Sequence, residues 1–482
     1  MRVIAGAIAI LIALRIVGAT VLPLSFDEAY YWLWSKNLAL SYYDHPPLIA
    51  YAIRLGTTMF GDSAFAVRSM PLLFSVVASW AVWRAADILL DDEQGGALAC
   101  LFFNLTLMAT VETMTATPDA PLTMAAALFV WALAKLEKTQ DWRWWFAVGA
   151  AGGLALLSKY TALFLGLGAG SWLIFTREGR RWIATPWPYL GMALAFALFA
   201  PVILWNAGHD WSSFRFQFGK TGAGHFAPHF LVEFLAGQIA LATPFIFVLG
   251  LLGLARRRGT QSVLLLALVA PSAIFFAEHA LHARVQGNWP SFLYPAFAIA
   301  AAKAALWTGD ADRTERVARF ARRWAVPTAI LFLAVVYGQA IFGFLPMRDP
   351  TARLLATGFE PVAQRIEALR HETKAEGVLT AAYATTGWLA FYLPSHPPIV
   401  QINEEYRWLA APKAEATLLS RPLLYVTEPR HEIRADLARS FSTLRFLGHV
   451  DRMRHGRVLG RYDIYLVSGF HGDPRGRITN GS

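Results

Sequence analysis

Charged residues and cysteine are scarce in this sequence of 482 residues. Only 16% of the residues are charged, against about a quarter in a soluble domain, and 56% are hydrophobic. The one cysteine, Cys100, lies inside an apolar run, so the chain has neither a disulfide framework nor a cysteine-based metal site. The composition excludes a soluble globular protein and is typical of a chain that crosses a membrane several times.

Cleavage signals, repeats and low-complexity segments are also missing. The first apolar run, Val3 to Leu22, reaches the acidic pair Asp27-Glu28 without an Ala-x-Ala pattern, which favours a retained first helix over a signal peptide. The sequence shows no repeat of fixed period and no compositionally biased tract.

The net charge of +10 does not indicate nucleic-acid binding, because lysine and arginine fall in short clusters between apolar runs. One series of these clusters predicts the cytoplasmic loops. It comprises Arg84, then Lys135, Lys138 and Arg143, then Arg177, Arg180 and Arg181, then Arg256 to Arg258, then Arg313, Arg316, Arg319, Arg322 and Arg323.

Apolar runs of about 20 residues, enough to cross roughly 30 Å of hydrocarbon, predict a polytopic α-helical membrane protein with about eleven transmembrane helices. The segment Trp144 to Phe175 is too long for one span, and we expect two short spans that turn at Ser158-Lys159-Tyr160. This hairpin keeps every arginine cluster cytoplasmic. With a cytoplasmic N-terminus and an odd number of spans, all twelve histidines and everything after Leu345 face outward.

The composition changes after Leu345. A helical pattern over Phe359 to Lys374 and strand-like runs at Gly377 to Thr385, Leu423 to Thr427 and Asp463 to Ser468 predict a small C-terminal extracytoplasmic α/β domain. The expected division is a transmembrane domain over residues 1–345, with interfacial helices in its first outward loop (23–68), and a soluble periplasmic domain over residues 346–482.

The first outward loop carries the carboxylates Asp27 and Glu28 among many Tyr and Trp side chains. A charged carboxylate at the centre of a membrane helix costs about 2.5 to 3.5 kcal/mol, so this pair belongs at the interface or in a wet cavity. Neighbours on a helix diverge by about 100°, so only one of the two can point squarely at a substrate. The pair could also simply end the first helix.

Five short motifs resemble those of the GT-C membrane glycosyltransferases, in the expected order and with similar spacing over roughly residues 1 to 310. The branch of this family that the sequence resembles includes the dolichyl-phosphate-mannose protein mannosyltransferases and the lipid A aminoarabinose transferases. The motifs are Asp27-Glu28-x-Tyr30-Tyr31, Tyr43-Asp44-His45-Pro46-Pro47-Leu48, Thr117-Pro118-Asp119, Ser158-Lys159-Tyr160-Thr161 and Gln286-Gly287-Asn288-Trp289-Pro290.

The resemblance implies an integral-membrane glycosyltransferase with an inverting mechanism. Its donor would be a monosaccharide on a polyprenyl phosphate such as undecaprenyl phosphate, and its acceptor lipid A, lipopolysaccharide core, another glycan or a protein. The chain lacks the β-trefoil insertion of eukaryotic protein mannosyltransferases, which points to a multi-pass bacterial inner-membrane protein acting on the periplasmic face.

The resemblance also implies roles for individual residues. Asp27 is expected to be the base toward the acceptor hydroxyl, with Glu28 beside it, and Asp119 is a further candidate catalytic residue that could bind acceptor, sugar or a metal. Asp119 could instead be an ordinary carboxylate at a helix N-terminus. The residues expected to bind substrate or lipid phosphate are Tyr30, Tyr43, Asp44, His45, Lys159, His279, His282, Arg284 and Asn288.

Plainer interpretations stand beside these roles. Lys159 could be a snorkelling lysine and Arg284 a headgroup-facing loop arginine. His45 occupies a position where the aminoarabinose branch often has lysine, so it could be packed, share a proton or ligate a metal. A divalent cation is left open, with Asp27, His45 and Asp119 as candidate ligands, since no ligand motif of fixed spacing is present.

Two other classes of protein compete with a transferase. A transporter or glycolipid flippase would also hold charges between helices, but we see no pair of related halves with broken helices. A non-catalytic scaffold would explain the C-terminal region but not the outward acids.

Overall fold

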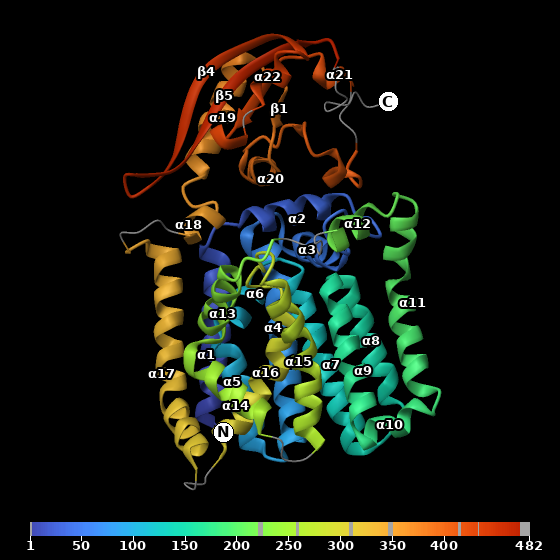
Figure 1. Ribbon diagram of the computed structural model, residues 1–482. Coiled ribbons are helices and arrows are strands. Elements are labelled where there is room, and N and C mark those ends of the chain that lie inside the picture. The colour runs from blue at the N-terminus through green and yellow to red at the C-terminus, as the bar shows by residue number, and fades with distance from the viewer. Residues whose placement is uncertain are drawn as a thin grey trace.

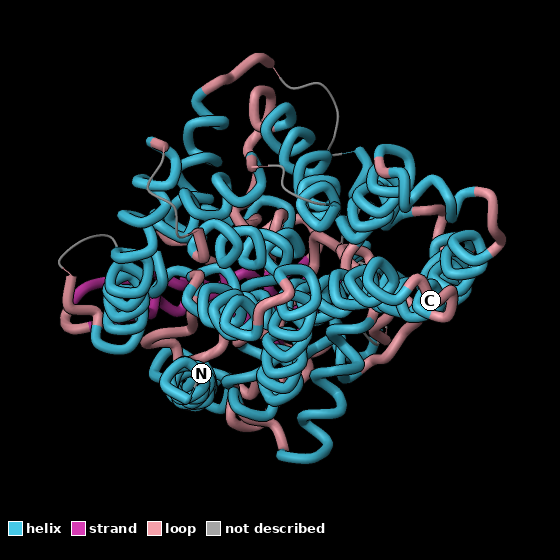
Figure 2. The backbone as a smooth tube through the Cα atoms, turned by 90° about the horizontal axis from the view of Figure 1, so that it is seen from below, coloured by secondary structure: helices cyan, strands magenta, loops and turns pink. Residues whose placement is uncertain are grey.

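The computed structural model describes residues 2–219, 225–256, 260–307, 312–345, 350–412, 416–431 and 433–472. Figure 1 shows a bundle of helices with a small sheet at one end of it, and Figure 2 shows the bundle helices nearly end-on.

Six helices within these ranges are long and apolar enough to cross a bilayer, or seven if one bent pair counts as a single span. The bent pair is α13 (His229–Ala242) and α14 (Pro244–Ala255), which meet at 101°. The six are α1 (Arg2–Val21), α4 (Ala64–Leu90), α7 (Asp119–Thr139), α11 (Trp187–Ala207), α15 (Thr260–His279) and α17 (Arg313–Phe342).

The bundle also contains shorter helices, which do not meet the length expected of a membrane span. The predicted count of about eleven spans is therefore not confirmed. Helix α8 ends at Ser158 and α9 begins at Leu163, so the long apolar segment is interrupted where the sequence predicts a turn. The shorter elements are α3 (Leu48–Phe60), α5 (Glu93–Leu105), α6 (Leu107–Glu112), α8 (Trp144–Ser158), α9 (Leu163–Phe175), α10 (Arg177–Ile183), α12 (Ser212–Gly219) and α16 (Tyr294–Ala305).

The C-terminal region is built on a five-stranded sheet with the order β2-β1-β3-β5-β4. Strand β1 pairs parallel with β2 and β3, whereas β5 is antiparallel to β3 and β4. The strands are β1 (Gly377–Thr380), β2 (Ile399–Gln401), β3 (Leu423–Thr427), β4 (Phe441–Arg454) and β5 (Arg457–Phe470), and the helices are α18 (Pro350–Leu354), α19 (Glu360–Thr373), α20 (Tyr383–Tyr392), α21 (Ala416–Leu419) and α22 (Arg434–Leu437). The predicted boundary at 345/346 adjoins residues outside the described ranges and stays a prediction.

Helix α2 (Phe26–Lys36) lies across the end of the bundle, between it and the sheet (Figure 1). Its Ala29 and Tyr30 share one apolar core with Val362 of α19 and Trp388 of α20. A Cβ on Gly387 of α20 would lie 2.9 Å from the backbone nitrogen of Tyr30, so this close approach requires glycine. The C-terminal region is therefore packed onto the helix that carries Asp27.

Candidate active site

Helix α2 begins with a capping box that fixes the directions of its two acidic side chains. The Ser25 hydroxyl accepts from the Glu28 N–H at 3.2 Å, and the Glu28 carboxylate accepts from the Ser25 N–H at 2.8 Å. Glu28 therefore turns back toward α1 and α4, while Asp27 points toward α20.

Glu28 is fully buried and its carboxylate is saturated with donors. The Arg68 guanidinium of α4 holds it in a two-pronged ion pair, with Nε to Oε1 at 2.6 Å and Nη2 to Oε2 at 2.7 Å. The Ala116 N–H, in the loop before α7, donates to Oε1 at 2.9 Å. With its acceptor positions occupied by protein groups, Glu28 joins α2, α4 and that loop, and its expected catalytic role stays a prediction.

Asp27 has a different environment. Tyr383, the first residue of α20, donates its phenolic hydrogen to Asp27 Oδ1 at 3.3 Å. Burial raises the pKa of Asp27 to about 7, with the hydrogen bond from Tyr383 opposing this rise. A carboxyl group that titrates near neutrality can accept a proton from a hydroxyl and release it again.

A chain of polar contacts connects Asp27 to Asp44 in the loop after α2. The Arg407 guanidinium lies 4.7 Å from the centre of the Tyr383 ring and donates Nη1–H to Asp44 Oδ1 at 2.7 Å. The Tyr30 hydroxyl donates to the other oxygen of Asp44, also at 2.7 Å. Asp44 and Tyr30, both predicted to bind substrate, thus belong to the surroundings of Asp27.

A second cluster surrounds Asp119 in the first turn of α7. Its carboxylate pairs with Lys159 at 2.7 Å and accepts from the side chains of Asn288 at 2.9 Å and Ser291 at 2.6 Å. Asp119 and Lys159 are almost completely buried. Lys159 is therefore neutralised by a carboxylate in this structure, rather than exposed as a snorkelling lysine.

Glu112, at the end of α6, interacts electrostatically with groups of both clusters. Its half-buried carboxyl group interacts electrostatically with Asp119, Lys159 and Asp27. Its side chain accepts a hydrogen bond from the Thr117 hydroxyl at 3.3 Å. The structure thus gathers three carboxyl groups and one ammonium group in one region.

Two other predicted residues, Tyr43 and His45, contact aromatic side chains. Tyr43 packs between the rings of Phe216 in α12 and Tyr406, with centroids 4.6 and 4.5 Å away. His45 stands edge-on to Tyr31, with centroids 6.3 Å apart. These contacts place both residues in the wall of aromatic side chains beside α2.

Arg284 and the two histidines at and just after the end of α15 form a separate group. Arg284 donates its Nε–H to Glu233 at 2.8 Å, and His279 packs between Phe275 and Trp289. His282 lies within 3.5 Å of Glu278. The structure does not bring these three side chains to Asp27 or Asp119.

The candidate metal ligands are not assembled. Within the described residues, no group of three or more His, Cys, Asp or Glu side chains is arranged to hold a metal ion. Asp119 is occupied by donors and Asp27 by Tyr383, so a metal site on Asp27, His45 and Asp119 does not fit this geometry.

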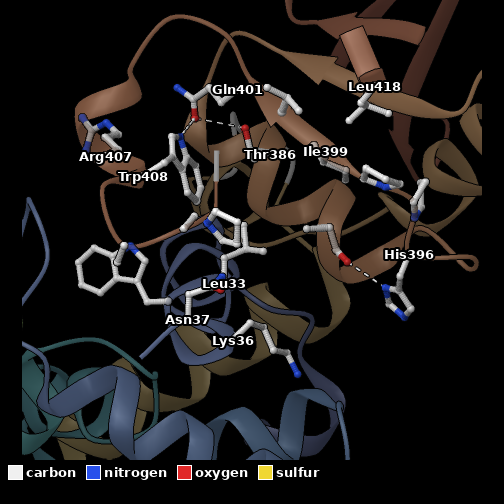
Figure 3. Close-up of a pocket in the computed structure, with 18 of the residues that line it drawn as sticks. Leu33, Lys36, Asn37, Thr386, His396, Ile399, Gln401, Arg407, Trp408 and Leu418 are labelled. Atoms are coloured by element: carbon white, nitrogen blue, oxygen red, sulfur yellow. Dashed lines mark hydrogen bonds between the residues drawn. The ribbon is translucent and has the colours of Figure 1, made fainter. Parts of the chain in front are cut away.

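A cavity of about 920 Å³ lies between α2 and the C-terminal region (Figure 3). Leu33, Lys36 and Asn37 form its α2 side, while Trp408 and Arg407 face it from the C-terminal region. Trp408 donates to Gln401 at 3.2 Å and so stands fixed in the wall. Arg407 therefore borders both this cavity and the surroundings of Asp27.

The sequence gives no local signal for several residues of this site. Tyr383 contacts Asp27, 356 residues away in the sequence, and Arg407 contacts Asp44, 363 residues away. Sequence periodicity gives no information about contacts at such separations. Arg68 lies in an apolar helix, where a charged side chain usually has a charged or polar partner. The sequence could therefore have indicated that Arg68 is paired, but not with which residue. Glu112 follows an apolar run, and nothing in its local sequence indicates that it lies near Asp27.

Comparisons with known proteins agree with this fold. The family model for dolichyl-phosphate-mannose-protein mannosyltransferase matches residues 44–205. The lipid A galacturonosyltransferase RgtD of Rhizobium johnstonii is 28% identical over 285 residues, which cover 57% of this chain and 59% of that protein. The matched region thus spans less than two thirds of that relative's length.

Two solved structures share the architecture. ArnT from Cupriavidus metallidurans, bound to undecaprenyl phosphate, is 16% identical with a TM-score of 0.63, and the match covers 96% of this chain and 97% of ArnT. The oligosaccharyltransferase of Archaeoglobus fulgidus, in complex with zinc and sulfate, is 14% identical with a TM-score of 0.52, covering 88% of this chain and 68% of that one.

The fold is the one that these two structures have, with a helical bundle carrying a smaller region at one end. The match to the mannosyltransferase family model, the similarity to RgtD and the fold shared with ArnT support the resemblance to the GT-C glycosyltransferases that the motifs predict. The family model and the relative are both named as glycosyltransferases.

Proposed function

We propose that this protein transfers a monosaccharide from a polyprenyl phosphate, such as undecaprenyl phosphate, to an envelope glycolipid. The observation that carries the proposal is the position of Asp27 on the helix that closes the end of the bundle, where it accepts a hydrogen bond from Tyr383 and where burial raises its pKa. The match to RgtD supports lipid A among the acceptors, and the fold shared with ArnT supports the lipid-phosphate donor. Lipopolysaccharide core, another glycan and a protein are the other acceptor classes.

In the proposed reaction the acceptor oxygen attacks the anomeric carbon and the bond from that carbon to the phosphate oxygen breaks, with inversion. The acceptor proton passes to Asp27, and the polyprenyl phosphate leaves with the bonding electrons. We place the phosphate near Lys159 and Asn288, because Glu112 connects their cluster to Asp27. The phosphate would compete with Asp119 for the Lys159 ammonium group.

The proposal includes the membrane arrangement that the charge pattern predicts. The arginine clusters face the cytoplasm, and α2 and the sheet face the periplasm of a bacterial inner membrane. In this arrangement Asp27 and Lys159 lie at the depth of the headgroups, where a lipid phosphate resides. The about eleven predicted spans and the division at 345/346 belong to the same proposal.

Mass spectrometry of envelope glycolipids tests this function. Cells that express the protein should contain a glycolipid that is heavier by one anhydro-sugar, and cells without it should lack that species. The purified protein should then form the same product from polyprenyl-phosphate sugar in vitro. Identical glycolipid profiles in the two strains, together with uptake of glycolipid by proteoliposomes without a new glycosidic bond, would favour the flippase class.

The hydrogen bond from Tyr383 predicts a shift in the pH dependence of transfer. Because this bond lowers the pKa of Asp27, Tyr383→Phe should raise that pKa and move the acid limb of the kcat/KM profile to higher pH. Since the base must be ionised, activity at pH 7 should fall several-fold and recover as the pH increases.

Tyr406→Phe is the matched control, because Tyr406 lies in the same region and its hydroxyl donates to Glu404 instead. Its pH profile should equal that of the wild type. A Tyr383→Phe profile that is merely lower at every pH would show that Tyr383 supports the fold without tuning Asp27.

A further inference from the structure

The cavity between α2 and the C-terminal region has walls of a particular chemical kind. Trp32, Trp34 and Tyr42 line it from the α2 side, and Trp408 lines it from the opposite side. Its volume of about 920 Å³ is near the upper end of the range of about 300–1,000 Å³ for ligand pockets. Trp32, Trp34 and Tyr42 are almost fully buried, whereas Trp408 is half-buried and offers an aromatic surface beside polar side chains, which suits a ligand with C–H faces and hydroxyl edges.

The cations on these walls are already neutralised. Lys36 pairs with Asp62 at 2.7 Å, and Arg421 pairs with Glu376. Arg407 pairs with Asp44 at 2.7 Å and with Glu404 at 3.0 Å. Each lysine or arginine that lines the cavity within the described residues thus has a carboxylate partner. A phosphate group would have to break one of these pairs, whereas a hydroxyl group can bond to the paired side chains.

The cavity and Asp27 share one wall. Arg407 lines the cavity and lies over the Tyr383 ring, and the Tyr383 hydroxyl bonds to Asp27. Trp408 also stands edge-on to Tyr30, with centroids 5.3 Å apart, and Tyr30 in turn contacts Tyr383 at 5.0 Å. A ligand held in the cavity would therefore be separated from the proposed base by the side chains of Arg407 and Tyr383.

We propose that this cavity binds the uncharged saccharide portion of the acceptor and presents one of its hydroxyl groups past Arg407 to Asp27. The assignment rests on the proposed transferase function and specifies the part of the acceptor that is recognised. Trp408 supplies the stacking face, and Gln401 holds the Trp408 indole in place (Figure 3). The phosphate and acyl groups of the acceptor stay outside the cavity.

Binding of a defined glycan tests the proposal. The probe is the glycan of lipopolysaccharide from the source organism, fully de-acylated and dephosphorylated, titrated into the purified full-length protein by calorimetry. The wild type should bind this probe, and Trp408→Ala should weaken binding by about tenfold or more, as for a tryptophan that anchors a ligand. Trp408→Phe keeps an aromatic face and should retain most of the affinity, which separates lost stacking from misfolding.

Trp324→Ala, which removes an exposed tryptophan from α17, is the control and should bind as the wild type does. Absence of binding, equal binding by Trp408→Ala, or binding only of the phosphorylated or acylated parent would overturn the assignment. Asp27→Asn should bind the neutral glycan normally while failing to glycosylate it. Failure of the catalytic proposal is thereby distinguishable from failure of the binding site.

Discussion

Purified Asp27→Asn protein is expected to lose sugar transfer by about 10²–10⁴-fold in kcat, the usual contribution of a general base. The amide keeps the size of the carboxyl group and can accept from Tyr383, but it cannot take the acceptor proton. Because the carboxylate is ionised at the cost of desolvation, the variant should be at least as stable as the wild type. The measurement is single-turnover transfer from a polyprenyl-phosphate sugar to lipid A.

Asp91→Asn is the matched control for this experiment. Asp91 lies between α4 and α5, away from the cavity, and its exposed carboxylate accepts from Lys138 at 3.0 Å. The loss of this pair should cost at most about 1 kcal/mol of stability and leave kcat within about twofold. If Asp27→Asn transfers sugar as fast as Asp91→Asn does, Asp27 is not the base and the mechanism has to be abandoned.

Local rules anticipated part of this site. The acidic pair was predicted to diverge by about 100°, and in the structure Asp27 contacts Tyr383 whereas Glu28 contacts Arg68. The rule could not say which of the two faces a partner, because the partners lie on α20 and α4. The assignment of Glu28 therefore required the fold.

The clustering of the Asp119 and Lys159 motifs illustrates a similar limit. In the sequence, Asp119 and Lys159 each lie in a loop beside an apolar run, and Lys159 was predicted to bind a lipid phosphate. Packing of α7 against α8 brings the two side chains to 2.7 Å, so the cation is stored with a carboxylate. Pairing of this kind depends on helix packing and not on spacing along the chain.

The number of membrane-spanning helices was the feature that sequence rules predicted least well, because it depends on the exact length of each apolar helix. Helices α3, α8, α9 and α16 are apolar but only 12 to 15 residues long, too short for about 30 Å of hydrocarbon if they stand upright. A hydropathy pattern marks such helices as apolar without distinguishing a span from a helix packed inside the bundle.

The scaffold hypothesis conflicts with the way the C-terminal region is packed. Its Trp388 and Val362 share a core with Ala29 and Tyr30 of α2, and its Tyr383 reaches Asp27. Removal of the residues after Leu345 would expose this core and leave Asp27 without its hydrogen-bond partner. A truncated chain would therefore test folding and catalysis together and could not isolate recruitment.

Among the variants considered, Arg68→Met is expected to cause the largest loss in the free energy of unfolding. Its guanidinium pairs with Glu28 and also donates to the backbone carbonyls of Ala19, Leu22 and Pro23 at the end of α1. Methionine fills similar space but leaves the Glu28 carboxylate buried without a counter-charge, which typically costs about 3–5 kcal/mol. A lower midpoint of thermal unfolding in detergent, with loss of the α2 geometry and of transfer, is the expected result.

Two further variants separate the buried charge from the lost contacts. Arg84→Met removes an arginine of the same helix whose pair with Asp87 is half exposed, and it should cost less than about 1 kcal/mol. Adding Glu28→Gln to Arg68→Met removes the uncompensated charge and should restore part of the stability, because the remaining cost comes from the unsatisfied carbonyl groups. If Arg68→Met is no less stable than Arg84→Met, the ion pair does not hold α2 in place, and the direction of Asp27 must be set by the capping box and by its contacts with α20.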